Sequence, residues 1–164
     1  MWSCNRRTVL NLSLALAVAG CGFQPAFGVS GTAKKLQMAI AVDPPGDKNA
    51  FDLVERLEQR LGRSSVPVYG LAYSIGTQAN GVGITQDYAI TRYNVAGSVS
   101  FVLRDLQTAQ DITSGSVEGF TSYSASGTTV STLIAERDAN ARLMRLLADQ
   151  IVARLIATSG AWGQ

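Results

Sequence analysis

The sequence contains no histidine and only two cysteines, Cys4 and Cys21, among its 164 residues. The absence of histidine excludes Ser-His-Asp triads, the usual zinc sites and acid–base catalysis by imidazole. If Cys4 is lost with an export signal and Cys21 is modified, no thiol remains for a disulfide or a thiolate metal site. We therefore expect a protein without cofactor or metal, while catalysis by a pair of carboxylates stays possible in principle.

The sequence also lacks a strong excess of either charge. It has 14 basic and 12 acidic residues, and two of the basic ones, Arg6 and Arg7, lie within residues 1–20, which hold no acid. Removal of that segment leaves 12 basic and 12 acidic residues on 144 residues. A balanced charge excludes a protein that depends on a basic surface to bind nucleic acid. The remaining length suits one domain with one core.

The first 20 residues have the pattern of an export signal. Arg6 and Arg7 precede the mostly apolar stretch 8–19, and Val18-Ala19-Gly20 stand directly before Cys21. The stretch is shorter than the roughly 20 apolar residues that span a bilayer. We predict that residues 1–20 form a signal peptide, cleaved before Cys21, whose thiol then carries lipid. Two or more acyl chains would hold the protein firmly on a membrane, and the number of chains stays open.

The export route stays open as well. Asn5-Arg6-Arg7-Thr8-Val9-Leu10 resembles a twin-arginine signal, but the same arginines could orient a general secretory signal. Bacterial lipoproteins that remain in the inner membrane often carry aspartate after the lipidated cysteine, and this chain has Gly22. We therefore predict a lipid-anchored protein on the periplasmic side of the outer membrane.

Residues 21–33 are rich in small and turn-forming types and are predicted to be a lipidated tether. Alternating apolar residues predict a strand over 36–42, and Val and Tyr enrichment predicts another over 66–75. Asn80-Gly81 and Gly83 predict a loop over 78–86.

Two segments have helical spacing. In 47–61, Asp47 is the expected N-cap and Gly62 the stop, and Asp52 and Arg56 are spaced for an i,i+4 ion pair. The face expected in the core holds Phe51, Val54, Leu57 and Leu61. A longer helix is predicted over 131–156, with Leu143, Leu147, Ile151 and Leu155 on its apolar side.

The clearest strand is 88–104. Its odd positions from Tyr93 to Leu103 are apolar or glycine, whereas the opposite face includes Arg92, Asn94, Ser98, Ser100 and Arg104. A turn at 105–108 and a more polar strand over 109–124 complete a hairpin, and Gly115 and Gly119 suggest a bulge or bend there.

The predicted order is β-α-β-β-β-α. It indicates an α+β fold: a two-layer sandwich of a mixed, mainly antiparallel four-stranded sheet and two helices. The predicted domain organisation is a signal peptide at 1–20, a tether at 21–33, the α+β domain at 34–158 and a short C-terminal tail at 159–164.

Several motifs in order resemble the LptE family, the lipopolysaccharide-assembly lipoproteins, and its alphaproteobacterial members in particular. They are Gly20-Cys21-Gly22-Phe23-Gln24-Pro25, Thr91-Arg92-Tyr93, Leu103-Arg104-Asp105, Ser122-Tyr123 and Ala135-Glu136-Arg137-Asp138-Ala139. The resemblance implies a non-enzymatic outer-membrane lipoprotein that plugs and helps assemble the LptD β-barrel and assists delivery of lipopolysaccharide to the cell surface. The implied partners are an LptD-like barrel, lipopolysaccharide, and outer-membrane lipid through acylated Cys21.

The resemblance also implies lipopolysaccharide-binding residues. A basic residue before aspartate near the start of the last helix is implicated in the family, and Arg137 matches it. The family's second basic position lies in the loop before the long strand, and residues 78–86 contain no Lys or Arg. Arg92 or Arg104 could take that role.

Two other functions fit part of the pattern. One is a transport-auxiliary periplasmic lipoprotein that serves another lipid or solute transporter and would not co-purify with a large barrel. The other is a lipid-anchored cell-wall enzyme, which would need a catalytic carboxylate or a Ser–Lys pair. None of Lys34, Lys35 and Lys48 lies in a Ser-x-x-Lys context.

Overall fold

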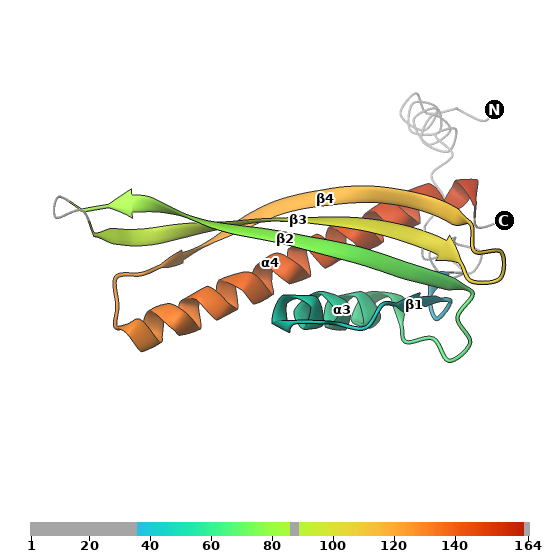
Figure 1. Cartoon of the computed structure of the whole chain (residues 1–164), viewed down its shortest axis with the longest axis horizontal. Helices are drawn as coiled ribbons and strands as arrows, with labels where there is room; N and C mark the ends of the chain where they lie inside the picture. Colours follow the sequence, from blue (N-terminus) through green and yellow to red (C-terminus); the bar gives the residue numbers. More distant parts are fainter. Residues whose placement is uncertain (1–35, 86–88, 163–164) are drawn as a thin grey trace, which may run out of the picture.

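The computed structural model describes residues 36–85 and 89–162, and the predicted signal peptide, the tether and Cys21 lie outside them. The element order is β1 (Ile40–Val42), α3 (Lys48–Leu61), β2 (Tyr69–Ile84), β3 (Ile90–Asp105), β4 (Asp111–Ser124), α4 (Thr129–Thr158) and a 3-10 turn η1 (Ser159–Ala161). The sheet order is β1-β2-β3-β4, with β1 parallel to β2 and the other pairs antiparallel. This arrangement confirms the predicted α+β fold (Figure 1).

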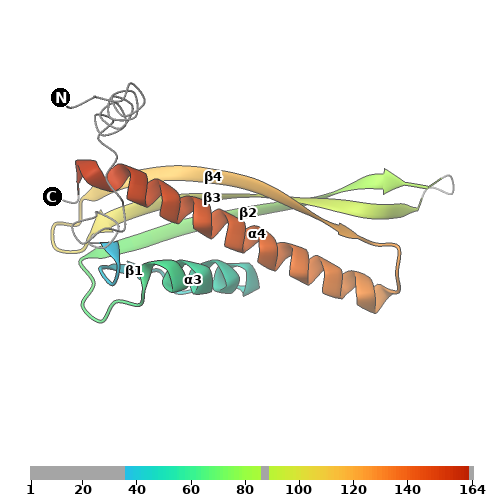
Figure 2. The same cartoon turned by 180° about the vertical axis from the view of Figure 1, so that it is seen from behind.

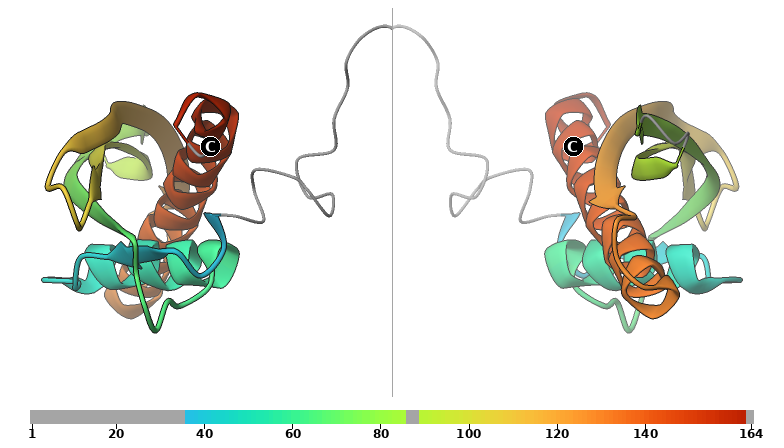
Figure 3. Two further views of the ribbon diagram at one scale, coloured as in Figure 1. Left: turned by 90° about the vertical axis from the view of Figure 1, so that its right-hand side faces the viewer. Right: turned by 90° about the vertical axis from the view of Figure 1, so that its left-hand side faces the viewer.

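The two helices lie on one side of the sheet, and α4 crosses the strands obliquely (Figure 2). Viewed end-on, the sheet is strongly twisted and curved (Figure 3). The core lies between the layers, and α4 contributes eight buried residues to it: Ala139, Leu143, Met144, Leu147, Ala148, Ile151, Val152 and Leu155. The predicted apolar stripe of this helix is therefore confirmed.

The first predicted strand is shorter than expected. Residues 36–39 form a turn in which Met38 adopts a left-handed φ of 60° and donates its backbone N–H to Leu61 O at 2.8 Å. Because this turn rotates the chain, Met38 is 63% exposed, whereas Leu36 and Ile40 are buried. Val42 is partly buried against the core, so Met38 alone departs from the predicted alternation, and the strand itself is β1.

Helix α3 begins and ends where predicted. The Asp47 carboxylate accepts a hydrogen bond from Ala50 N at 2.7 Å, and Gly62 ends the helix with a φ of 79°. The predicted inner face is partly wrong, because Leu53 is fully buried whereas Phe51 is 54% exposed.

The predicted ion pair inside α3 is also wrong. Asp52 pairs with Lys48, one turn earlier in the helix. Arg56 reaches out of the helix and pairs with Asp149 of α4. Packing of the two helices thus gives Arg56 a partner that short-range spacing does not show.

Strand β2 runs through the segment predicted as a loop. Its pairing with β3 extends from Tyr69↔Asp105 to Ile84↔Ile90, with register shifts only around Gly83. The Asn and Gly residues therefore sit in a long ribbon rather than in a loop. Since β1 has three residues and pairs only as far as Leu71, the rest of β2 has one edge without a partner strand in the described part of the chain.

Strand β3 confirms the predicted division into two faces. Val95, Val99 and Leu103 are buried beneath the helices, and the alternate positions point away from them. The β3–β4 ladder passes Gly115 and Gly119 without a register shift, and the shift falls at Leu103/Arg104 instead. A Cβ on Gly119 would lie 2.5 Å from Leu146 Cδ2. The lack of a side chain at Gly119 therefore allows α4 to pack closely against β4, and no bulge forms there.

Candidate functional site

The side of the sheet away from the helices is open, polar and low in relief. We call it the open sheet face. Strands β2, β3 and β4 contribute Ala72, Ser74, Gly76, Gln78, Arg92, Asn94, Ala96, Ser98, Ser100, Val102, Arg104, Ser114, Ser116, Glu118, Phe120 and Ser122. Small side chains leave a hollow of about 430 Å³ at its centre, lined in part by Gly76, Ser98 and Glu118. Phe120 is an apolar exception at 72% exposure.

The predicted binding arginines separate into two groups. Arg92 lies near the start of β3 and Arg137 in the third turn of α4, so both belong to the end of the molecule where β3 and α4 begin. We call this the distal end (Figure 1). Both side chains are exposed, and neither makes an ion pair or hydrogen bond within residues 36–85 and 89–162.

Arg104 lies at the opposite end of β3. Twelve residues separate it from Arg92, and at about 3.3 Å per residue the two are roughly 40 Å apart. The Arg104 Nε–Asp111 Oδ1 distance is 2.7 Å, and this carboxylate raises the pKa of Arg104 above its usual value. The structure therefore brings Arg92 and Arg137 to one end and Arg104 to the other.

The distal end also exposes apolar side chains. Val130, Leu133 and Ile134 lie on the first two turns of α4 and are 68%, 46% and 61% exposed. A groove of about 380 Å³ runs beside them, lined by Ala125, Gly127, Thr129, Thr132, Leu133 and Glu136. An end that combines exposed arginines with apolar side chains suits an amphiphile that carries both phosphate and acyl chains.

Beneath this end, the aromatic side chains of Tyr93 and Tyr123 stack with their ring centroids 5.3 Å apart. Burial raises the pKa of Tyr123, and Glu136 of α4 and Tyr93 raise it further. Thr121 Oγ1 donates to Ala139 O at 3.0 Å. The Thr121–Ala139 hydrogen bond joins the end of β4 to α4, two residues along the helix from Arg137.

Within the described ranges, no group of three or more His, Cys, Asp or Glu side chains could hold a metal ion. In the same part of the chain, no helix combines the length and apolarity needed to cross a membrane.

The family model for lipopolysaccharide-assembly LptE proteins matches residues 34–155. The chain belongs to the LptE family. Members of this family are non-enzymatic lipoproteins that act in lipopolysaccharide assembly, so the prediction that the chain is not an enzyme is confirmed.

Solved structures show the same fold as this LptE-family chain. A lipoprotein from Caulobacter crescentus CB15 is 20% identical, with a TM-score of 0.69, and the match covers 81% of this chain and 98% of that one. Rare lipoprotein B from Shewanella oneidensis is 12% identical, with a TM-score of 0.60, over 78% of this chain and 99% of that one. A search of curated protein sequences found no match.

Proposed function

We propose that this LptE-family chain is an outer-membrane lipoprotein that plugs and helps assemble an LptD-like β-barrel and assists delivery of lipopolysaccharide to the cell surface. The observation that carries the proposal is the family match over residues 34–155, which covers nearly the whole described domain. The first 20 residues act as the signal peptide, and the acylated Cys21 holds the domain on the periplasmic side of the membrane.

The open sheet face supports the role of a plug. The interior of a transmembrane β-barrel is polar, and a body that fills it must present polar side chains of low relief. The serine-rich rows of β3 and β4 meet this requirement, and the balanced charge avoids broad repulsion. The distal end would then contact lipopolysaccharide, with Arg92 and Arg137 pairing with its phosphates in two-point contacts.

Affinity purification from detergent-solubilised outer membrane tests the proposal. We expect a large β-barrel protein to co-purify with the tagged chain, and we expect depletion of the chain to lower the amount of correctly folded barrel. Co-purification with a different transporter would favour the transport-auxiliary function instead. Unchanged barrel levels together with unchanged surface lipopolysaccharide would rule the proposed function out.

A further inference from the structure

A second surface of the molecule, apart from the distal end, combines arginines with apolar side chains. It is a shallow hollow of about 670 Å³ along an exposed stripe of α4, bordered by Arg56 of α3, and we call it the interhelical groove. Its lining consists of Arg56, Arg142, Arg145, Leu146, Asp149, Gln150 and Ala153. All but Arg56 come from one stripe of α4, about 16 Å long at 1.5 Å per residue.

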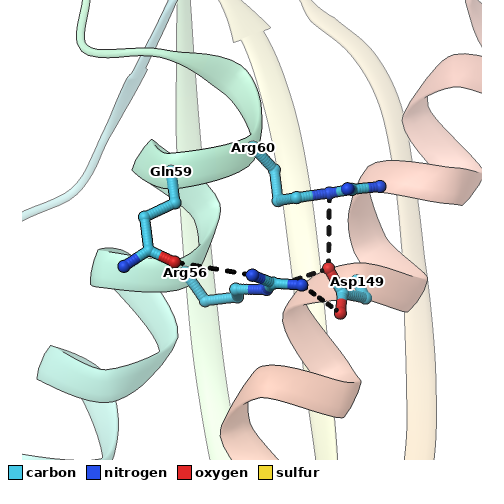
Figure 4. A network of polar contacts seen from close by, with 4 residues as sticks. All are labelled: Arg56, Gln59, Arg60 and Asp149. Atoms are coloured by element: carbon cyan, nitrogen blue, oxygen red, sulfur yellow. Dashed lines mark hydrogen bonds and ion pairs between the residues drawn. The ribbon is translucent and has the colours of Figure 1, made fainter.

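The positive charge in this groove exceeds the negative charge. Arg56 of α3 donates two hydrogen bonds to the Asp149 carboxylate, from Nε to Oδ1 at 3.1 Å and from Nη2 to Oδ2 at 2.9 Å. Arg60 approaches the same carboxylate, with its Nε 3.4 Å from Oδ1 (Figure 4). One carboxylate therefore serves two guanidinium groups, and an uncompensated charge remains.

Of the two further arginines on α4, only Arg145 adds to this excess. Arg142 pairs with Asp138 and donates to Ser122 O at 3.2 Å. Arg145 is exposed and makes no hydrogen bond or ion pair with any residue that the structure describes. Its planar fork is available for an external carboxylate.

The floor of the groove is apolar. Leu146 is 40% exposed, whereas Leu143 and Leu147 beside it are fully buried. The Leu146 side chain therefore lines the groove at the border of the core. Ala153 continues the floor two turns further along α4. An apolar floor bordered by arginines matches a partner that carries apolar and acidic side chains together.

We propose that the interhelical groove docks an acidic protein segment with apolar side chains, lying along α4 with its carboxylates toward Arg145 and Arg60. A lipid fits less well, because the short apolar floor would leave an acyl chain largely in water. The inference holds whether or not the partner is a barrel protein.

Photo-crosslinking in cells tests this proposal. The full-length chain carries p-benzoylphenylalanine in place of Gln150 in the groove, or in place of Glu55 on the exposed outer side of α3 as the control position. We expect an adduct from position 150 and none from position 55, and mass spectrometry should map it to a segment of net negative charge. An adduct with a neutral or basic segment, an adduct with lipid, or no adduct would overturn the proposal.

Charge substitutions at Arg145 test whether electrostatic attraction directs the partner segment into the groove, or whether the segment is merely nearby. Arg145→Glu should lower the adduct yield at position 150 at least tenfold, and Arg145→Lys should largely retain it. Since Arg145 is exposed and has no partner within the described residues, we expect both variants to fold, and circular dichroism checks this. A Glu→Lys change in the captured segment should restore the adduct yield in the Arg145→Glu variant. If Arg145→Glu does not lower the yield and the Glu→Lys change does not raise it, charge does not direct docking.

Discussion

At the scale of single residues, Asp105 illustrates how a turn can depend on one charge. Its carboxylate accepts hydrogen bonds from the backbone N–H groups of Gln107 at 2.7 Å and Thr108 at 3.0 Å. These bonds favour the ionised form and lower the pKa of Asp105. The charge therefore stabilises the turn between β3 and β4, and with it the end of the molecule opposite the distal end.

The lowered pKa predicts how stability depends on pH. The contribution of Asp105 is present above its unfolded-state pKa of about 3.9 and is lost as the pH falls through the lower folded-state pKa. Asp105→Asn keeps an acceptor oxygen without the charge, so it should be less stable than wild type at pH 7 but equal to it in strong acid. Urea midpoints at a series of pH values measure this, and a pH-independent difference would contradict it.

At the scale of elements, the contact between β3 and α4 depends on Gly97. A Cβ there would lie 2.9 Å from Leu143 Cδ2 and 3.4 Å from Leu147 Cδ1, and both leucines are fully buried. Because neither can move into solvent, Gly97→Ala should lower the free energy of unfolding by about 1–3 kcal/mol.

Gly76→Ala is the matched control, since Gly76 lies on β2 and its Cβ would meet only Ser98 Oγ at 3.4 Å. Equilibrium urea unfolding of both variants makes the comparison. Equal losses at the two positions would mean that overpacking against α4 is not the cause.

The elements that could be predicted from sequence are those with one buried and one exposed side. β3 and α4 meet this condition, and most of their inner residues are as predicted, although Leu146, expected beside the apolar stripe of α4, is 40% exposed. β2 does not, because its far half is largely exposed on both sides and contains Asn80, Gly81 and Gly83, a pattern that predicts a loop. Phe51 and Leu53 lie two residues apart in α3, and only the position of α4 decides which of them is buried.

The candidate sites were less predictable for a related reason. The separation of Arg92 from Arg104 follows from their places near opposite ends of one predicted strand, whereas the position of Arg137 at the same end as Arg92 depends on how α4 lies across the sheet. The interhelical groove depends on Arg56 meeting Asp149, 93 residues away. Local spacing instead suggested Asp52 as the partner of Arg56, and no signal in the sequence indicated otherwise.

At the scale of the whole molecule, the proposed lipid on Cys21 attaches the domain to the membrane independently of a barrel partner. When the chain is produced in excess over the barrel protein, Cys21→Ala should release the excess domain from the membrane fraction, because acyl chains contribute about 0.8 kcal/mol per buried CH₂. Cys4→Ala, within the predicted signal peptide, is the control and should leave the protein membrane-bound. Fractionation and immunoblotting provide the measurement. A Cys21→Ala protein that still sediments with membranes would show that the attachment lies elsewhere.

The unpaired edge of β2 has a consequence for the protein outside its complex. From Ala72 to Ile84 this edge presents backbone donors and acceptors, and the strand contains no charged residue and no proline, the devices that usually stop one sheet from adding to another. A second molecule could extend the sheet by pairing its own β2 edge with this one, and that pairing would occupy the free β2 edges of both molecules. Overproduction without the natural partners should therefore favour dimers joined edge to edge through β2.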